Sequence, residues 1–174
     1  GFMVGDFVRD KDAVTSTLLA CEIAALTKAN GSSFFNALID LYTIHGLFKE
    51  RLVSITKKGK TGAQEIQKLI DEARTSPPIK INGSRVIKID DYQSSISQNK
   101  TISTASGINI PKANVLIFTT EDGSRIALRP SGTEPKIKYY ISVNKTLKIA
   151  SEFESVELEL EAKINEILKE MNLE

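Results

Sequence analysis

The chain has 174 residues, enough to bury a sizeable core in one domain or in a domain with an appendage. Its 41% hydrophobic and 26% charged residues exclude a disordered chain, and a net charge of +1 gives no reason to expect nucleic acid or an anionic membrane as a general partner. A single cysteine excludes an internal disulfide framework. No apolar run approaches the roughly 20 residues of a membrane span, and the start has no signal-peptide pattern, so we expect a cytoplasmic protein.

The first part of the chain predicts two helices. Residues 1–10 mix apolar side chains with Gly5, which favours a short strand or an extended entry segment. From Asp12 onward apolar residues recur at helical spacing, and Asn30-Gly31 is a typical helix end. Ser32 or Ser33 is a candidate N-cap for a second amphipathic helix that ends near Gly46. The short connection between these helices predicts that they pack on each other as a hairpin.

Three residues of this part have side chains that could act at a functional site. Cys21 stands among apolar residues of the first helix, so we expect a buried small hydrophobe rather than a nucleophile. His45, the only histidine, has no Cys, Asp or Glu at ligand spacing, so no metal or catalytic role is expected. Lys11 lies in a dense charge cluster that a solvated loop would explain, with Asp12 serving only as an N-cap.

The part after residue 48 combines strands and helices. Residues 51–56 predict a strand, and residues 61–64 match a capping box at the start of a helix that Pro77-Pro78 ends. Residues 85–90 alternate in the manner of a strand. The long polar stretch 93–109 is expected to be a loop, a mobile flap rather than a packed element.

A hairpin, a further strand and a helix complete this part. Residues 114–120 and 124–128 are strand-like and are separated by Glu121-Asp122-Gly123, an Asp-Gly turn signal, and residues 136–143 again favour a strand. The acidic last helix has an apolar stripe that is expected to be buried, formed by Leu160, Ile164, Ile167, Leu168 and Met171. These elements predict an α+β fold with a mostly antiparallel sheet backed by helices.

The loop between the last two strands, residues 129–136, is suited to an anion. Arg129 offers a planar fork that can grip two phosphate oxygens, and Ser131 and Thr133 each add a hydroxyl donor. Gly132 allows backbone N–H groups to approach a ligand and permits the positive φ that a concave nest of amides requires. The loop therefore predicts a phosphate-binding site at the rim of the sheet.

Other features of the loop support this prediction, although a simpler interpretation exists. Pro130 and Pro135 restrict the loop, so less conformational entropy is lost when it closes on a ligand. Lys136 and Lys138 add positive charge nearby. An isolated Ser-Gly-Thr would more simply be an ordinary turn, with Arg129 a solvated strand end.

The complete string is more specific than its parts. Arg-Pro-Ser-Gly-Thr-Glu-Pro-Lys followed by an aromatic strand resembles the phosphate-binding loop in the C-terminal domain of the α-D-phosphohexomutases, the phosphoglucomutase/phosphomannomutase family. The resemblance implies that Arg129, Ser131, Gly132 and Thr133 hold the non-transferring phosphate of a sugar phosphate, with Lys136 as a candidate further contact.

The start of the chain resembles the same family. Residues 1–14 are similar to the end of its third domain, and Lys11 matches a lysine that, in the branch with an Arg-x-Lys-Asp segment, reaches toward the phosphosugar. The resemblance implies that residues 1–48 are a helical remnant of this third α/β domain. It also implies that residues 49–174 are the fourth domain, with a TATA-binding-protein-like sheet backed by helices, a likeness that implies no DNA binding.

Other motifs of the family do not occur in the sequence. These are the Ser-His-type phosphoserine loop, the Asp-x-Asp-x-Asp loop that holds magnesium and the sugar-selecting Glu-x-Ser-type loop. The resemblance therefore implies the C-terminal part of a longer enzyme that interconverts hexose 1-phosphate and hexose 6-phosphate through a phosphoserine and a bisphosphate intermediate. Mg²⁺ is implied for the full-length enzyme, whereas this chain is expected to hold no metal or cofactor.

The implied partners are a hexose phosphate and the N-terminal domains of the same chain. Without those domains we expect the chain to be inactive, and glucose, mannose, glucosamine and pentose phosphates all stay open as substrates. An alternative is a stand-alone phosphate- or nucleotide-sensing module, which would have a complete core from residue 1. A nucleic-acid-binding domain is disfavoured because the chain lacks a basic stripe interleaved with aromatic residues.

Overall fold

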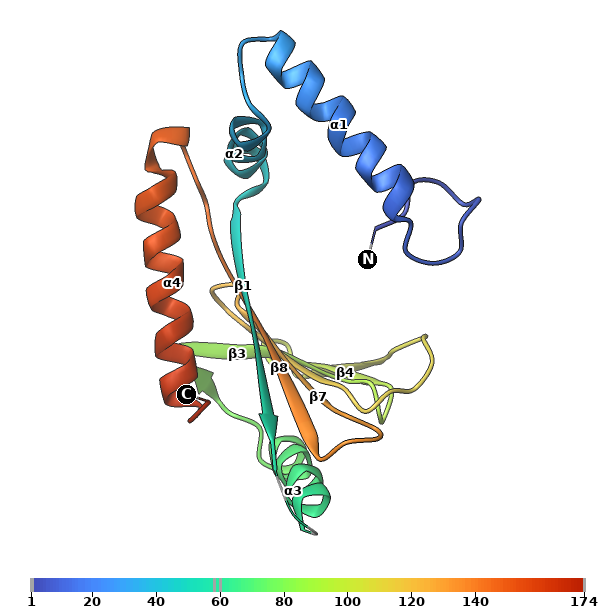
Figure 1. Ribbon diagram of the computed structural model, residues 1–174. Helices are drawn as coiled ribbons and strands as arrows, with labels where there is room; N and C mark the ends of the chain where they lie inside the picture. Colours follow the sequence, from blue (N-terminus) through green and yellow to red (C-terminus); the bar gives the residue numbers. More distant parts are fainter. Residues whose placement is uncertain (1, 58, 60, 174) are drawn as a thin grey trace. The chain divides into compact units, whose positions relative to one another are not determined.

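The computed structural model describes residues 2–57, 59 and 61–173. The chain divides into two compact units, one of residues 1–46 with 146–153 and one of residues 47–145 with 154–174. Figure 1 shows the elements of both units in the order in which they follow one another along the chain. Lys58 and Lys60, which the sequence places in a solvated turn, lie outside the described residues.

The first unit contains the two expected helices, α1 (Ala13–Ala29) and α2 (Phe34–His45). Asp12 caps α1 by accepting from the N–H groups of Val14 and Thr15, and Ser33 caps α2 by accepting from Asn36 N–H, so both predicted caps are confirmed. These caps form because a short polar side chain satisfies amide donors that have no partner within the helix.

Two expectations for this unit are wrong. Residues 2–10 form no strand; they make a looped segment closed by a hydrogen bond from Asp12 N–H to Phe2 O (2.9 Å). Cys21 is exposed rather than buried, since α1 contacts α2 but has no buried residue. Helical periodicity located α1 correctly, whereas burial also requires a second layer on the apolar face, and the described residues of this unit do not supply one.

The described residues of the second unit build one antiparallel sheet of eight strands. The strands are β1 (Leu47–Thr56), β2 (Lys80–Ile81), β3 (Ser84–Asp91), β4 (Ile96–Asn99), β5 (Thr104–Gly107), β6 (Leu116–Thr120), β7 (Arg125–Pro130) and β8 (Lys136–Lys145). Their order is β1-β8-β7-β6-β3-β4-β5, with β2 paired to β3. The predicted α+β class with an antiparallel sheet is confirmed.

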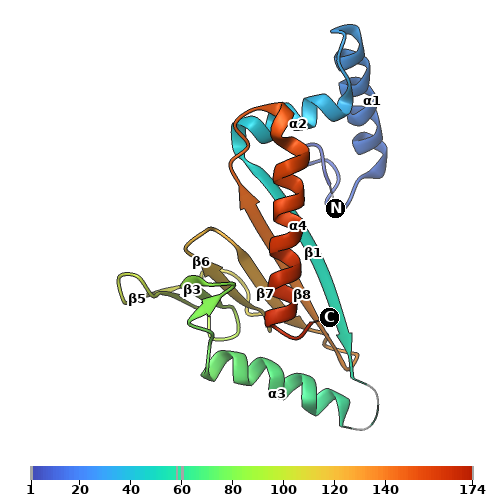
Figure 2. The same ribbon diagram turned by 90° about the vertical axis from the view of Figure 1, so that its left-hand side faces the viewer.

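Helices cover one face of this sheet. α4 (Phe153–Glu170) runs along β1 and β8 within this unit, as Figures 1 and 2 show, and Glu157 and Glu161 of α4 pair with Lys49 and Arg51 of β1. α3 (Gly62–Thr75) contacts β7 and β8 and buries Ile66 and Ile70. The core between the sheet and these helices contains Leu116, Phe118, Ile126, Ile137, Ile141, Val143, Leu160, Ile164 and Ile167, each at most 2% exposed.

The face of the sheet away from α4 follows from the alternation of side chains along each strand. On β8, Ile137, Tyr139 and Ile141 are buried, so Lys138 and Tyr140 point to the opposite face. This open face carries the polar side chains that matter for the site.

The stretch 93–109, expected to be an irregular flap, instead contains the β4–β5 hairpin. Both strands are short and largely exposed, and β4 also pairs with β3. The expectation was wrong because serine, threonine and asparagine show no apolar alternation here, while backbone hydrogen bonds extend the sheet regardless of side-chain type.

The start of α3 also differs from the sequence prediction. Thr61 makes no side-chain cap to the helix, and its hydroxyl donates to the carboxylate of Glu65 (3.1 Å), so the predicted capping box with Gln64 does not form. Thr61 has helical backbone angles, which carry its hydroxyl away from the amide groups that an N-cap would satisfy.

Candidate functional site

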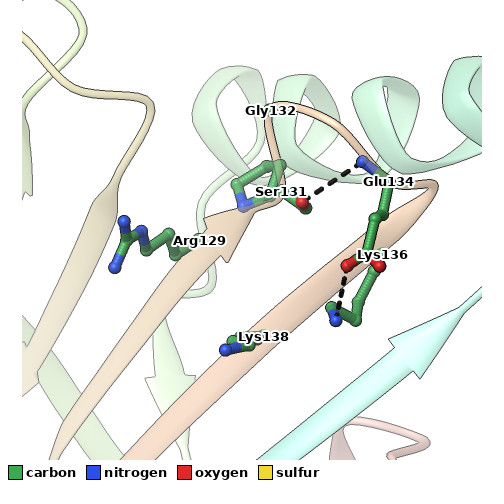
Figure 3. A pocket seen from close by; sticks show the side chains of 7 residues that line it. Arg129, Ser131, Gly132, Glu134, Lys136 and Lys138 are labelled. Atoms are coloured by element: carbon green, nitrogen blue, oxygen red, sulfur yellow. Dashed lines mark hydrogen bonds and ion pairs between the residues drawn. The ribbon is translucent and has the colours of Figure 1, made fainter.

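A pocket of about 200 Å³ lies where β7 ends and β8 begins. Its lining, shown in Figure 3, combines the ends of both strands with the loop between them: Arg129, Pro130, Ser131, Gly132, Glu134, Lys136 and Lys138. Three of these side chains are cationic and one is a carboxylate, so the pocket has the charge balance of an anion site.

The two strands place a pair of cations side by side. Arg129 of β7 lies directly opposite Lys138 of β8 in the antiparallel register, and both point to the open face of the sheet. Like charges in this relation repel each other. In the part of the chain that the structure describes, neither Arg129 nor Lys138 forms an ion pair, so their charges are left for a ligand to neutralise.

The loop itself is held by hydrogen bonds from its own residues. Ser131 Oγ accepts from the N–H groups of Thr133 (3.4 Å) and Glu134 (3.3 Å), and Ser131 N–H donates to the carbonyl oxygen of Lys136 (2.7 Å). Outside the loop, Lys57 N–H donates to the carbonyl oxygen of Pro135 (2.9 Å), which ties the loop to the end of β1. The backbone of the site is therefore positioned without a ligand.

A carboxylate and an ammonium group meet inside the pocket. Glu134 Oε2 lies 2.7 Å from Lys136 Nζ, and this hydrogen bond together with the charge of Lys136 lowers the pKa of Glu134 below its usual value. Glu134 is thus ionised at neutral pH and forms an ion pair with Lys136, whereas Arg129 and Lys138 form no ion pair among the described residues.

The expected site residues fall into three groups. Arg129, Ser131, Gly132 and Lys136 line the pocket together, whereas Thr133 does not line it and contributes its N–H to the loop. Lys11 belongs to the other compact unit and pairs there with Asp10 (2.6 Å). The structure thus assembles four of the six candidate residues at one pocket.

One expectation about the loop is wrong. Gly132 does not have a positive φ, so it forms no left-handed nest in this arrangement. The Ser131 hydroxyl oxygen accepts from two N–H groups of the loop and so holds these amides without a left-handed glycine. A Cβ at Gly132 would meet no atom within 4 Å, so this position is open toward the pocket rather than crowded.

Sequence reasoning missed Glu134 as a pocket residue. A carboxylate would not be chosen for an anion site on chemical type alone. Its position two residues before Lys136, with Pro135 between them, was the available signal, because the fixed φ of proline limits how far the two flanking side chains can separate.

The pocket does not suit a metal ion. Its side chains are mainly cationic, and across residues 2–57, 59 and 61–173 no group of three His, Cys, Asp or Glu could hold a metal. The Mg²⁺ implied for the full-length enzyme therefore has no matching residues at this pocket.

Across residues 2–57, 59 and 61–173, no helix is both long enough and apolar enough to cross a membrane.

Comparison with known proteins supports the family resemblance of the residues that form this loop. Residues 54–159 match the family model described as the phosphoglucomutase/phosphomannomutase C-terminal domain. A phosphoglucomutase from Staphylococcus haemolyticus is 37% identical over 83% of this chain, and one from Staphylococcus aureus is 41% identical over 82%. Each alignment covers 26% of the relative, so the chain spans about a quarter of the length of these proteins.

Comparison with solved structures also finds a phosphoglucomutase. The crystal structure of pp63/parafusin, a phosphoglucomutase from Paramecium in its open form, matches 94% of this chain and 28% of its own with a TM-score of 0.52. At 15% sequence identity this likeness concerns the fold alone. Because the family model covers more than half of the residues and the relatives exceed 35% identity, the chain belongs to the phosphoglucomutase/phosphomannomutase family.

Proposed function

We propose that this chain is the substrate-phosphate-binding portion of a cytoplasmic phosphohexomutase that interconverts hexose 1-phosphate and hexose 6-phosphate. In this proposal residues 49–174 are the C-terminal domain, and residues 1–48 are the end of the domain before it, where Lys11 contacts the substrate. The observation that carries the proposal is the cross-strand pair of Arg129 and Lys138, which both line the pocket and form no ion pair among the described residues.

The proposed role follows from the chemistry of these groups. The guanidinium of Arg129 donates two parallel hydrogen bonds to phosphate oxygens, and the ammonium of Lys138 supplies a second positive charge beside it. The hydroxyl of Ser131 lines the same pocket, and its oxygen accepts from loop amides, which leaves its hydrogen to donate to the phosphate. Thr133 N–H donates to Ser131 Oγ and so helps to hold the loop. Gly132 has open space around it, which leaves room for the ligand.

Binding of the non-reacting phosphate would serve the reaction in two ways. It fixes the position of the sugar, so binding energy from one end of the substrate orients the other end at the reacting centre. It also lets the domain close over the substrate and exclude water that would otherwise accept the phosphoryl group. The phosphoserine and Mg²⁺ of the full-length enzyme would be supplied by other domains.

An NMR titration tests the site. The ¹⁵N-labelled chain is titrated with glucose 1-phosphate, with Arg129→Ala as the matched control. Because a few charge-assisted hydrogen bonds contribute about 1.5–3 kcal/mol each before the cost of association, we expect a dissociation constant of about 1 mM. Amide shifts confined to Ser131, Gly132 and Thr133 and lost in the control are the expected result; no shifts at high ligand would reject the proposed phosphate site.

A coupled assay tests whether the chain has mutase activity without the other domains. The purified chain is incubated with glucose 1-phosphate and an enzyme that consumes glucose 6-phosphate. We expect no turnover above a blank, because the sequence contains neither the phosphoserine loop nor the magnesium loop of the family. Turnover above the blank would mean that the chain performs the chemistry itself.

A further inference from the structure

Among the described residues that line the pocket, Glu134 is the one whose charge opposes a phosphate ligand. It lies on the loop between two cationic positions, 2.7 Å from Lys136 Nζ, as the dashed line in Figure 3 shows. A phosphate that takes over the Lys136 donor now facing Glu134 displaces this carboxylate. The question is whether Glu134 merely shapes the loop or competes with the ligand.

Exposure of the two side chains favours competition. The Glu134 side chain is 60% exposed, whereas that of Lys136 is 27% exposed. An exposed ion pair of this kind contributes little free energy, because water solvates the carboxylate almost as well after its side chain rotates away from Lys136. Lys136 is held more closely by its surroundings, so its ammonium stays at the pocket when the carboxylate leaves.

The backbone of Glu134 is anchored independently of its side chain. Its N–H donates to Ser131 Oγ, and its carbonyl oxygen accepts from Lys136 N–H (2.7 Å). Movement of the carboxylate from Lys136 into solvent thus needs only side-chain rotation, with the loop backbone unchanged. The exchange can occur without loss of the hydrogen bonds that shape the site.

We infer that Glu134 is an internal counterion of the anion pocket, which an incoming phosphate displaces from Lys136 and which takes its place again when the phosphate leaves. This inference rests on the proposed phosphate-binding function. Two physical effects give Glu134 this role: its carboxylate competes for Lys136, and after displacement its charge stays on the same short loop and repels the bound dianion. Both effects weaken phosphate binding and favour release of the ligand.

The variant Glu134→Gln separates this role from a structural one. It removes the charge and keeps the size, so phosphate should bind more tightly, by about fivefold, the change that corresponds to the upper range for an exposed ion pair. Glu134→Asp keeps the charge but shortens the reach to Lys136, so its affinity should fall between those of the wild type and Glu134→Gln. If Glu134 instead held Lys136 in a binding position, both variants would bind phosphate more weakly.

The experiment is the NMR titration of the chain with inorganic phosphate and with glucose 1-phosphate. Glu121→Gln is the matched control, since it makes the same change in net charge at the opposite end of β7, and it should leave the affinity unchanged. In a Lys136→Ala background, Glu134→Gln should give at most half of the gain, because only repulsion remains. Amide shifts of Ile141 and Val143 report that each variant is folded.

The outcomes distinguish this inference from the function on which it rests. Absence of binding by the wild type would reject the phosphate site and the counterion role together. Binding by the wild type with unchanged or weaker binding by Glu134→Gln would reject the counterion role alone. If Glu134→Gln increases phosphate affinity equally in the presence and absence of Lys136, Glu134 acts by repulsion alone and is not displaced from Lys136. That result also rejects the counterion role.

Discussion

The two ends of β7 are both turns of a β-hairpin, yet their polar groups are arranged in opposite ways. At the β6–β7 turn, Asp122 accepts from the hydroxyl of Thr120 (2.6 Å) and from Ser124 N–H (3.1 Å), and pairs with Lys163 of α4 (2.8 Å). At the β7–β8 loop, Arg129 and Lys138 have no ion-pair partner among the described residues. The first turn is closed on the protein, and the second is open to a ligand.

The closed turn shows what a structural polar cluster requires. Gly123 has φ of +83°, a backbone angle that favours glycine, and a Cβ there would lie 2.8 Å from Asn144 Nδ2 and would displace that side-chain amide. Asn144 donates to the carbonyl oxygen of Gly123 (2.8 Å). At the open loop, Gly132 has neither constraint. Internal partners, rather than the types of turn residue, thus distinguish the closed turn from the open loop.

Removal of the Asp122 charge should give the largest effect. Asp122→Asn keeps an acceptor for Thr120 and Ser124 but loses the charged partner of Lys163, so the free energy of unfolding should fall by about 1–2 kcal/mol, a range already reduced for the partial exposure of the pair. Urea unfolding measures it. Glu121→Gln, the adjacent exposed carboxylate, is the control and should change stability by less than about 0.5 kcal/mol. Equal effects of both variants would remove the distinction between the two turns.

The contribution of the Asp122 carboxylate to stability should disappear in acid. Burial alone would raise the pKa of Asp122, but hydrogen bonds from Lys163, Thr120 and Ser124 outweigh it and hold the pKa well below its usual range. A lowered pKa in the folded state stabilises the protein above the unfolded pKa of about 3.9, and this stabilisation is lost as the pH falls further. The stability difference between wild type and Asp122→Asn should therefore shrink from about pH 5 downward; a constant difference down to pH 2 would contradict it.

A smaller effect is expected from a change in the shape of one cation. Arg129→Lys keeps the charge at the open loop but replaces the planar fork with a single point, so phosphate should bind about fivefold more weakly, a loss of about 1 kcal/mol. The NMR titration with glucose 1-phosphate measures it, with Asp122→Asn as a variant that should bind like the wild type. Unchanged affinity in Arg129→Lys would show that charge alone determines binding.

The smallest effect concerns the stability of the ligand-free loop. Lys138→Ala relieves the repulsion across β7 and β8, so the free energy of unfolding should rise by a few tenths of a kcal/mol. Thermal unfolding without phosphate measures it, and addition of phosphate should stabilise the wild type more than the variant. A variant that is less stable without phosphate would mean that the two cations are already compensated within the protein.

Much of the fold was predictable where local interactions decide it. The caps at Asp12 and Ser33, the end of α1 at Asn30-Gly31 and the hairpin turn at Gly123 all depend on groups within a few residues of one another. The β4–β5 hairpin and the exposure of Cys21 were not predictable in this way. Both depend on whether another element lies beside the segment, which residue type alone does not encode.

For the candidate site, the sequence by itself determined the residues of the β7–β8 loop, since Arg129, Ser131 and Gly132 lie within four positions of one another and their chemistry is local. Only the tertiary structure decided that Lys138 lies opposite Arg129, that Thr133 N–H donates to Ser131 Oγ, and that Glu134 pairs with Lys136. The physical reason is that strand register and side-chain rotation determine which charges meet. Those charges, in turn, decide whether the loop is closed on itself or open to an anion.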